Sequence, residues 1–221
     1  MSRSIKTPHR TSLLVRGAAV VGALAAAAGV AGAQSRGEVP CGGQFELRPL
    51  VGALLATGAH HDLLENAVLV GGEVAYRLHR NVGVVGAVAW SPSSDRTTWG
   101  TGAGLHHGED VDLYQYDLGV EGRLPGRLGS AAWTVTPFGS LGAGGRTYRY
   151  RDVDGVDART NFVAYAGAGA DLGPREGRWG VRVEARDYVS AFKGLRGELP
   201  EREARNDVSL VAGLTFALGR R

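Results

Sequence analysis

The sequence predicts an all-β fold, an eight-stranded antiparallel up-and-down transmembrane β-barrel that follows a cleaved signal peptide. Three observations predict it. The stretch 179–189 (WGVRVEARDYV) alternates apolar residues with Arg182, Glu184 and Arg186, so one face is apolar and the other charged. Seven further segments are predicted strands, of which 82–90 alternates poorly, and the connections between the strands are alternately long and short. An apolar outside and a polar inside are typical of a barrel whose wall contacts lipid.

Residues 1–33 have the parts of a secretory signal peptide. Basic residues precede an apolar run at 17–29 (GAAVVGALAAAAG), which is shorter than the ~20 residues that a spanning helix needs. A transmembrane anchor is therefore the weaker interpretation. An A-x-A site ends at Ala33 and predicts cleavage before Gln34. We expect a signal peptide at 1–33, a periplasmic N-terminal segment at 34–44 and a barrel at 45–218.

The eight predicted strands each have a length close to the ~9–11 residues that a tilted spanning strand needs. Their ranges are 45–56, 67–78, 82–90, 113–124, 133–146, 161–172, 179–189 and 207–218. The long connections with charged or polar residues are 91–112, 147–160 and 192–206. Outer-membrane barrels have short periplasmic turns and long external loops, and an even strand number returns both mature termini to the periplasm.

Charged residues recur on the inward face of the predicted strands. We expect them to form a paired network inside the barrel, because an unpaired buried charge costs several kcal/mol. The inward acids are Glu46, Glu73, Asp117, Glu121, Asp171 and Glu184, and the inward bases are Arg48, Arg77, Arg123, Arg146, Arg182 and Arg186. Such a network predicts a lumen filled by side chains, since eight strands enclose little more room than that.

Aromatic residues on the outward face gather near strand ends, as anchoring at the two membrane interfaces requires. The predicted periplasmic girdle is Phe45, Tyr76, Trp133, Trp179 and Phe216, and the external girdle is Trp90, Tyr114, Tyr116 and Phe162.

Net charge gives no reason to expect a nucleic-acid partner. The chain has a formal net charge of +3, but the signal peptide contributes Arg3, Lys6, Arg10 and Arg16, and their removal reverses the sign. The histidine pairs at 60–61 and 106–107 raise the question of a metal site. Adjacent residues on a strand point in opposite directions, so we expect these pairs to be solvated loop residues and expect neither a metal nor a cofactor.

Four segments carry a family resemblance, namely TPFGSLGAGG (136–145), NFVAYAGAGADL (161–172), VRVEARDYVSAF (181–192) and VSLVAGLTFAL (208–218). With them the chain resembles the small eight-stranded outer-membrane barrels of the OmpA/OmpX type. Within that group it is similar to the outer membrane protein beta-barrel domain family over roughly 45–218. The resemblance implies the outer membrane of a Gram-negative-type envelope. It also implies outer-membrane lipid, lipopolysaccharide and the outer-membrane assembly machinery as partners.

We expect a non-enzymatic barrel with a structural or surface-interaction role that presents its loops outward, to a surface partner that the sequence does not identify. A narrow porin-like channel for small solutes or lipophiles is the alternative, because Leu54, Gly83, Val85, Ala87 and Ala89 make part of the inner wall small and apolar. Two further readings stay open. A lipid-modifying enzyme would have only the loop histidines as candidate bases, and a soluble lipocalin-like barrel would place the apolar face inside.

Overall fold

The computed structural model describes residues 44–101, 104–124, 128–129, 132–153, 155–174, 177–195 and 203–218. The predicted signal peptide and the cleavage site between Ala33 and Gln34 lie outside the described residues, as does the segment 34–43.

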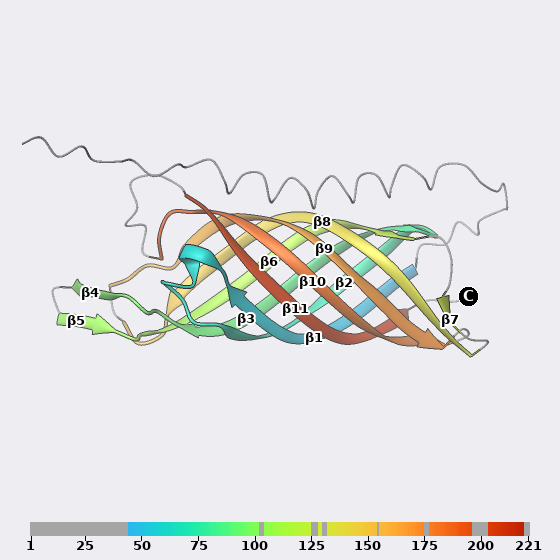
Figure 1. Ribbon diagram of the computed structural model, residues 1–221, viewed down its shortest axis with the longest axis horizontal. Coiled ribbons are helices and arrows are strands. Elements are labelled where there is room, and N and C mark those ends of the chain that lie inside the picture. Colours follow the sequence, from blue (N-terminus) through green and yellow to red (C-terminus); the bar gives the residue numbers. More distant parts are fainter. Residues whose placement is uncertain are drawn as a thin grey trace, which may run out of the picture. The chain divides into compact units, whose positions relative to one another are not determined.

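Eight long strands form one closed antiparallel sheet. They are β1 (Gln44–Ala56), β2 (Ala67–His79), β3 (Val82–Ser94), β6 (Asp110–Arg123), β8 (Trp133–Tyr150), β9 (Arg159–Pro174), β10 (Trp179–Phe192) and β11 (Glu203–Leu218). Each pairs with the next one in this order, and β11 pairs with β1 to close the barrel (Figure 1). The predicted fold class is therefore confirmed.

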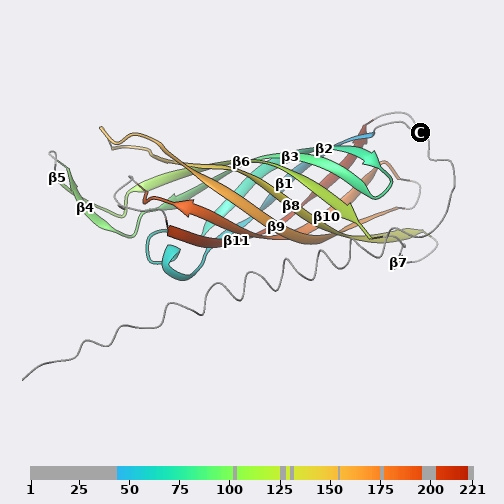
Figure 2. The same cartoon turned by 90° about the horizontal axis from the view of Figure 1, so that it is seen from above.

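Smaller elements distinguish the two ends of the barrel. The terminus end holds the start of β1, the end of β11 and the two-residue strand β7 (Leu128–Gly129), which pairs with the start of β8. The loop end holds the 3₁₀ helix η2 (Gly58–His60) and a separate hairpin of β4 (Thr98–Thr101) and β5 (Gly104–His107), as Figures 1 and 2 show. Within the described residues, no helix is long and apolar enough to cross a membrane.

The strands are staggered around the barrel. A path through paired residues leaves β1 at Phe45, crosses each strand once and returns to β1 at Leu55. It passes through Tyr76, Val84, Val120, Leu141, Ala166, Asp187 and Val208. This stagger is what closes a tilted sheet into a barrel. Residues paired across strands therefore lie at different heights along the barrel axis.

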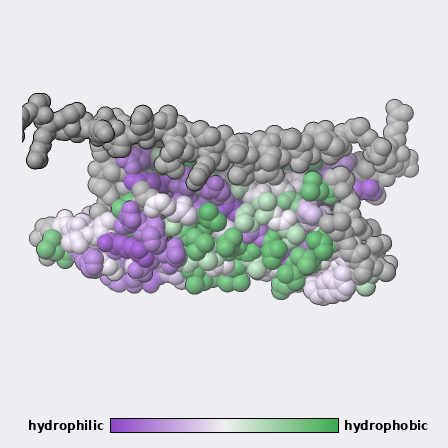
Figure 3. Space-filling model, viewed as in Figure 1, coloured by the Kyte–Doolittle hydropathy of each residue, from purple (hydrophilic) through white to green (hydrophobic). Residues whose placement is uncertain are grey.

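The two faces of β10 show the orientation of the wall. Val181 and Val183 are 37% and 44% exposed on the outside, whereas Arg182 and Glu184 are 0% and 4% exposed on the inside. Apolar residues also form much of the wall seen in Figure 3, and hydrophilic residues concentrate toward the end that carries β4 and β5. The soluble lipocalin-like interpretation is therefore wrong.

The strands are longer at the loop end than the sequence analysis predicted. β3 continues to Ser94 and β8 to Tyr150, while β11 begins at Glu203, so the predicted loops 91–112, 147–160 and 192–206 are too long. The first of them also contains the β4–β5 hairpin. On β6 and β8 the reason is a change of pattern: beyond this point their inward residues are apolar and their outward residues are polar, a composition that resembles a loop.

Candidate functional site: the lumen

An ion-pair network fills the half of the lumen nearer the terminus end. We call it the ion-pair plug, and its members are Glu46, Arg48, Glu73, Arg77, Glu121, Arg123, Asp171, Arg182, Glu184 and Arg186. They come from five strands, β1, β2, β6, β9 and β10, and each guanidinium reaches a carboxylate of another strand.

Arg48 lies at the centre of the plug and is 1% exposed. Its Nη1 atom is 2.8 Å from Glu121 Oε2 and 3.1 Å from Glu73 Oε2, and its Nη2 atom is 2.6 Å from Glu46 Oε2. One guanidinium therefore joins carboxylates from three strands, β1, β2 and β6. Charge-assisted bonds with this geometry satisfy donors and acceptors that would otherwise be buried without partners.

Arg182 has the same role on the opposite side of the network. Its Nη2 atom is 2.6 Å from Glu121 Oε2 and 3.2 Å from Glu184 Oε2, and its Nη1 atom is 3.1 Å from Asp171 Oδ1. The guanidinium carbon also lies 3.6 Å from the centre of the Phe138 ring, a cation–π contact. Arg186 completes the plug through Glu73 and Glu184.

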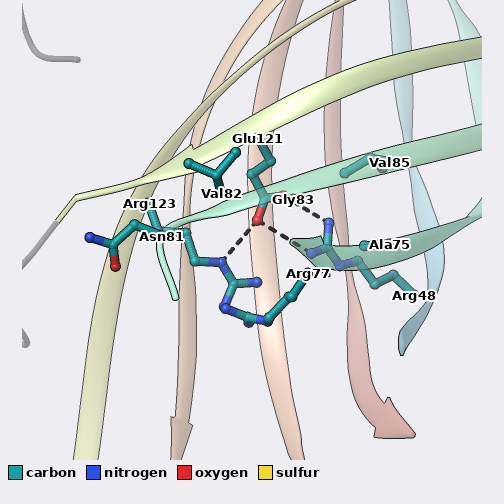
Figure 4. Close-up of a pocket in the computed structure, with 9 residues that line it drawn as sticks. All are labelled: Arg48, Ala75, Arg77, Asn81, Val82, Gly83, Val85, Glu121 and Arg123. Atoms are coloured by element: carbon teal, nitrogen blue, oxygen red, sulfur yellow. Dashed lines mark hydrogen bonds and ion pairs between the residues drawn. The ribbon is translucent and has the colours of Figure 1, made fainter. Parts of the chain in front are cut away.

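The terminus end of the plug is closed by Arg77 and Arg123. Both bind Glu46, and Arg123 Nε is also 2.9 Å from Glu121 Oε1. Figure 4 shows Glu121 between Arg123 and Arg48, with dashed lines to both. The cavity beside them has a volume of about 10 Å³, which is the space of about one water molecule. Beside these described side chains the lumen therefore has room for about one water molecule.

Asp117 and Arg146, the other two predicted network residues, lie nearer the loop end. Asp117 Oδ2 accepts hydrogen bonds from Gln115 Nε2 at 3.1 Å and from the Tyr188 hydroxyl at 3.3 Å. Arg146 Nη2 donates to Gln115 Oε1 at 2.7 Å. A cavity of about 20 Å³ lies on the inner wall at this level, lined in part by Leu50, Ala87 and Ala89. All twelve predicted residues thus lie in the lumen and are buried or half-buried.

The hydrogen-bonded pair of Asp207 and His60 also lies in the lumen and was not predicted from the sequence. Asp207 binds Arg146, and its Oδ1 atom is 2.7 Å from His60 Nδ1. Both residues are 1% exposed, so the expectation that His60 is a solvated loop residue was wrong. The sequence did indicate the position of Asp207. Along β11 it alternates in step with Ser209 and Val211, whose side chains point into the lumen. The predicted balance of six acids and six bases therefore omitted Asp207.

A cluster of buried apolar residues fills the lumen at the loop end. Its members are Leu54, Leu64, Val111, Leu113, Tyr148, Tyr150, Phe192 and Leu195. The His60 ring lies against it, 4.9 Å from the Phe192 ring. The other loop histidines lie outside this cluster: His61 and His107 are exposed, and His106 stacks on Trp99 at 4.6 Å.

The nine predicted girdle residues all lie on the outside of the barrel and are exposed. At the terminus end, the Phe45 and Tyr76 rings are 4.8 Å apart and the Trp133 and Trp179 rings 6.0 Å apart. At the loop end, Trp90 pairs in register with Tyr114. The predicted membership is Phe45, Tyr76, Trp133, Trp179 and Phe216 at the terminus end, and Trp90, Tyr114, Tyr116 and Phe162 at the loop end. Asp187, which follows Ala185 on the outside of β10, is a charged residue on the outward face.

A wall with apolar residues outside and a charged, filled lumen inside is the arrangement of a small outer-membrane barrel. A family model described as "Outer membrane protein beta-barrel domain" matches residues 17–219. The chain belongs to this family. Its place is therefore the outer membrane, and its lumen is the side-chain-filled polar interior that the sequence predicted.

Two solved structures support the fold. Neisserial surface protein A, from Neisseria, matches with a TM-score of 0.51 and 12% identity, over 79% of this chain and 98% of that one. OprG from Pseudomonas aeruginosa matches with a TM-score of 0.53 and 14% identity, over 80% of this chain and 97% of that one. At these identities the likeness concerns the fold alone. No curated protein matches the sequence.

Proposed function

We propose that this protein is a closed, non-enzymatic outer-membrane barrel that presents its loop end to a partner outside the cell. The observation that carries the proposal is the filled lumen. Arg48 and Arg182 bridge carboxylates across it, and two cavities of the inner wall beside the network have volumes of about 10 and 20 Å³. A barrel closed in this way has its loop end as the surface available to a partner. The porin-like alternative requires a passage that these side chains occupy.

The orientation follows from the connections. The terminus end has the short turn at His79–Val82, and the loop end has η2 and the β4–β5 hairpin. Outer-membrane barrels place long connections outside, so we assign the loop end to the exterior and both mature termini to the periplasm. The exposed aromatic girdles are suited to contact with membrane lipid and lipopolysaccharide. The assembly machinery of the outer membrane is the expected partner during insertion.

A non-catalytic role is supported by the surroundings of His60. The imidazole that Asp207 orients is buried against Phe192, and no serine hydroxyl among the described residues is hydrogen-bonded to it. A lipid-modifying enzyme of this kind needs a nucleophile beside a base, whereas the described neighbours of His60 are a carboxylate and two aromatic rings. One structural neighbour, Neisserial surface protein A, is named as a surface protein, in keeping with the proposed role.

Conductance across a planar bilayer tests whether the lumen is closed. We expect the purified, folded barrel to produce no steady current, because the ion-pair plug fills the section nearer the terminus end. Heat-modifiable gel mobility of the same sample verifies that the barrel is folded. A steady open conductance from the folded protein would overturn the proposal in favour of the porin-like alternative.

Surface labelling of intact cells tests the orientation. Leu105, in the β4–β5 hairpin, is 83% exposed, so a Leu105→Cys variant in a Cys41→Ser background offers one accessible thiol. We expect a membrane-impermeant maleimide to label it without cell lysis. A matched Leu124→Cys variant, at the terminus end and 46% exposed, should react only after the outer membrane is opened. The reverse result would place the loop end in the periplasm.

A further inference from the structure

The segment between β1 and β2, Thr57 to Asn66, lies across the loop end of the lumen, and we call it the strap. His60 and Leu64 point from it into the interior and are 1% and 2% exposed. Leu64 joins the apolar cluster, and the His60 ring lies 4.9 Å from Phe192 and 6.3 Å from Tyr148. The strap thus covers the apolar cluster with side chains of its own.

Two sets of contacts hold the strap. Toward β11, Thr57 Oγ1 donates to the Asn206 carbonyl at 2.6 Å, and His60 Nδ1 lies 2.7 Å from Asp207 Oδ1. Toward β3, the Glu65 amide donates to the Ser94 carbonyl at 3.1 Å, and Ser93 Oγ donates to the Glu65 carbonyl at 2.7 Å. The contact through His60 differs from the rest because it reaches into the lumen and joins the strap to a buried carboxylate.

This buried contact is incompletely satisfied. Asp207 is shared between His60 and Arg146, while His60 Nε2 is buried with no hydrogen-bond partner among the described residues. A buried nitrogen without a partner costs free energy that hydration would recover. Gly58, next to the start of the strap, has a φ of +56°, and no atom lies within 4 Å of the position its Cβ would take. The strap therefore has a glycine around which its backbone can turn.

We propose that the strap is a hinged lid, that the His60–Asp207 hydrogen bond is its latch, and that it forms a second closure in series with the ion-pair plug. The two closures are separate along the axis. Between them lie Leu50, Ala87, Ala89 and the cavity of about 20 Å³. Opening the lid exposes Arg146, Asp207 and the apolar cluster to the solvent at the loop end, whereas the plug keeps the barrel closed to ions.

Cysteine accessibility tests the lid in the purified, folded barrel. A Ser190→Cys variant in a Cys41→Ser background places a thiol at a position on β10 that is 1% exposed. Adding His60→Ala should raise its rate of reaction with a small methanethiosulfonate at least tenfold. The matched control is His61→Ala, because His61 is the neighbouring residue and is exposed, and we expect a rate within twofold of the parent.

A second variant keeps the test valid if His60→Ala fails to fold. Heat-modifiable gel mobility verifies that each of the two variants forms the folded barrel. Asp207→Asn weakens the latch with little change of volume and should also raise the rate. The lid is overturned if both latch variants are folded and react within twofold of the parent.

Conductance separates the lid from the plug. We expect His60→Ala alone and Arg182→Met alone to stay closed, and the double variant to conduct. Current from His60→Ala alone would contradict the closed plug of the proposed function while leaving the lid standing. If Arg182→Met conducts equally with and without His60→Ala, the strap does not close the lumen. If the double variant gives no current, the two closures are not arranged in series.

Discussion

Strand β6 is built in two opposite ways along its length. Between the girdles its outward residues include Leu118 and Val120, and its inward residues include Asp117 and Glu121. Beyond Tyr114 the pattern reverses. Val111 and Leu113 are buried inside, and Asp110 and Asp112 lie on the outward face. One strand therefore changes from apolar outside to polar outside within a few residues.

β8 makes the same change at the level where it pairs with this part of β6. Leu141 lies outside and Arg146 inside, whereas beyond them Tyr148 and Tyr150 are inside and Arg149 is outside. The cause is the solvent. Charged side chains are unfavourable against the lipid around the wall, so they face the lumen there. Water surrounds the loop end, and an ordinary apolar core is favourable at that level. The reversal marks the membrane boundary on the loop side independently of the girdle.

The largest expected effect is in the ion-pair plug. Arg182→Met leaves Glu121, Asp171 and Glu184 short of a counter-ion, and removing one partner of a buried ion pair costs about 3–5 kcal/mol of the free energy of unfolding. Urea unfolding in lipid vesicles measures it.

Arg149→Met, on the outward side of the loop end, is the matched control. We expect a change within about 0.5 kcal/mol, as for other exposed positions. Similar losses for the two variants would mean that the charges in the lumen contribute no more to stability than those in water.

The sequence was sufficient for the eight strands, because apolar and polar faces alternate through most spanning segments and the short turn after β2 marks the start of β3, whose two faces are both apolar. It was insufficient at the loop end, where the alternation persists but changes sign: YRYR at 148–151 was taken for a charged loop, although Tyr148 and Tyr150 are buried. Asp207 was read as the start of a strand, and His60 as part of a solvated loop. Their contact depends on β11 returning to β1 and on how the strap folds, and neither is local in the sequence.

An arginine on the lipid-facing wall tests the boundary itself. Leu118→Arg places a charge on the outward face between the girdles and should lower the free energy of unfolding by about 2–4 kcal/mol, because lipid cannot solvate it. Ser94→Arg places the charge on the outward face at the loop end of β3. There we expect the free energy of unfolding to change by no more than about 0.5 kcal/mol. Unfolding in the same vesicles compares the two. A similar cost at both positions would place Ser94 in the hydrocarbon as well.

The smallest expected effect concerns the glycines under Tyr165. A Cβ atom on Gly142 would lie 2.4 Å from Tyr165 Cε1 and 2.7 Å from the Leu118 carbonyl oxygen. Gly142→Ala should therefore cost about 1–3 kcal/mol, since the ring has to move within a filled lumen. Gly86→Ala adds the same methyl group on the outside, where its nearest neighbour is Leu118 Cδ1 at 3.9 Å, and should be close to neutral. Equal stabilities in urea unfolding would show that the lumen between the girdles yields to a methyl group, in contrast to a close-packed interior.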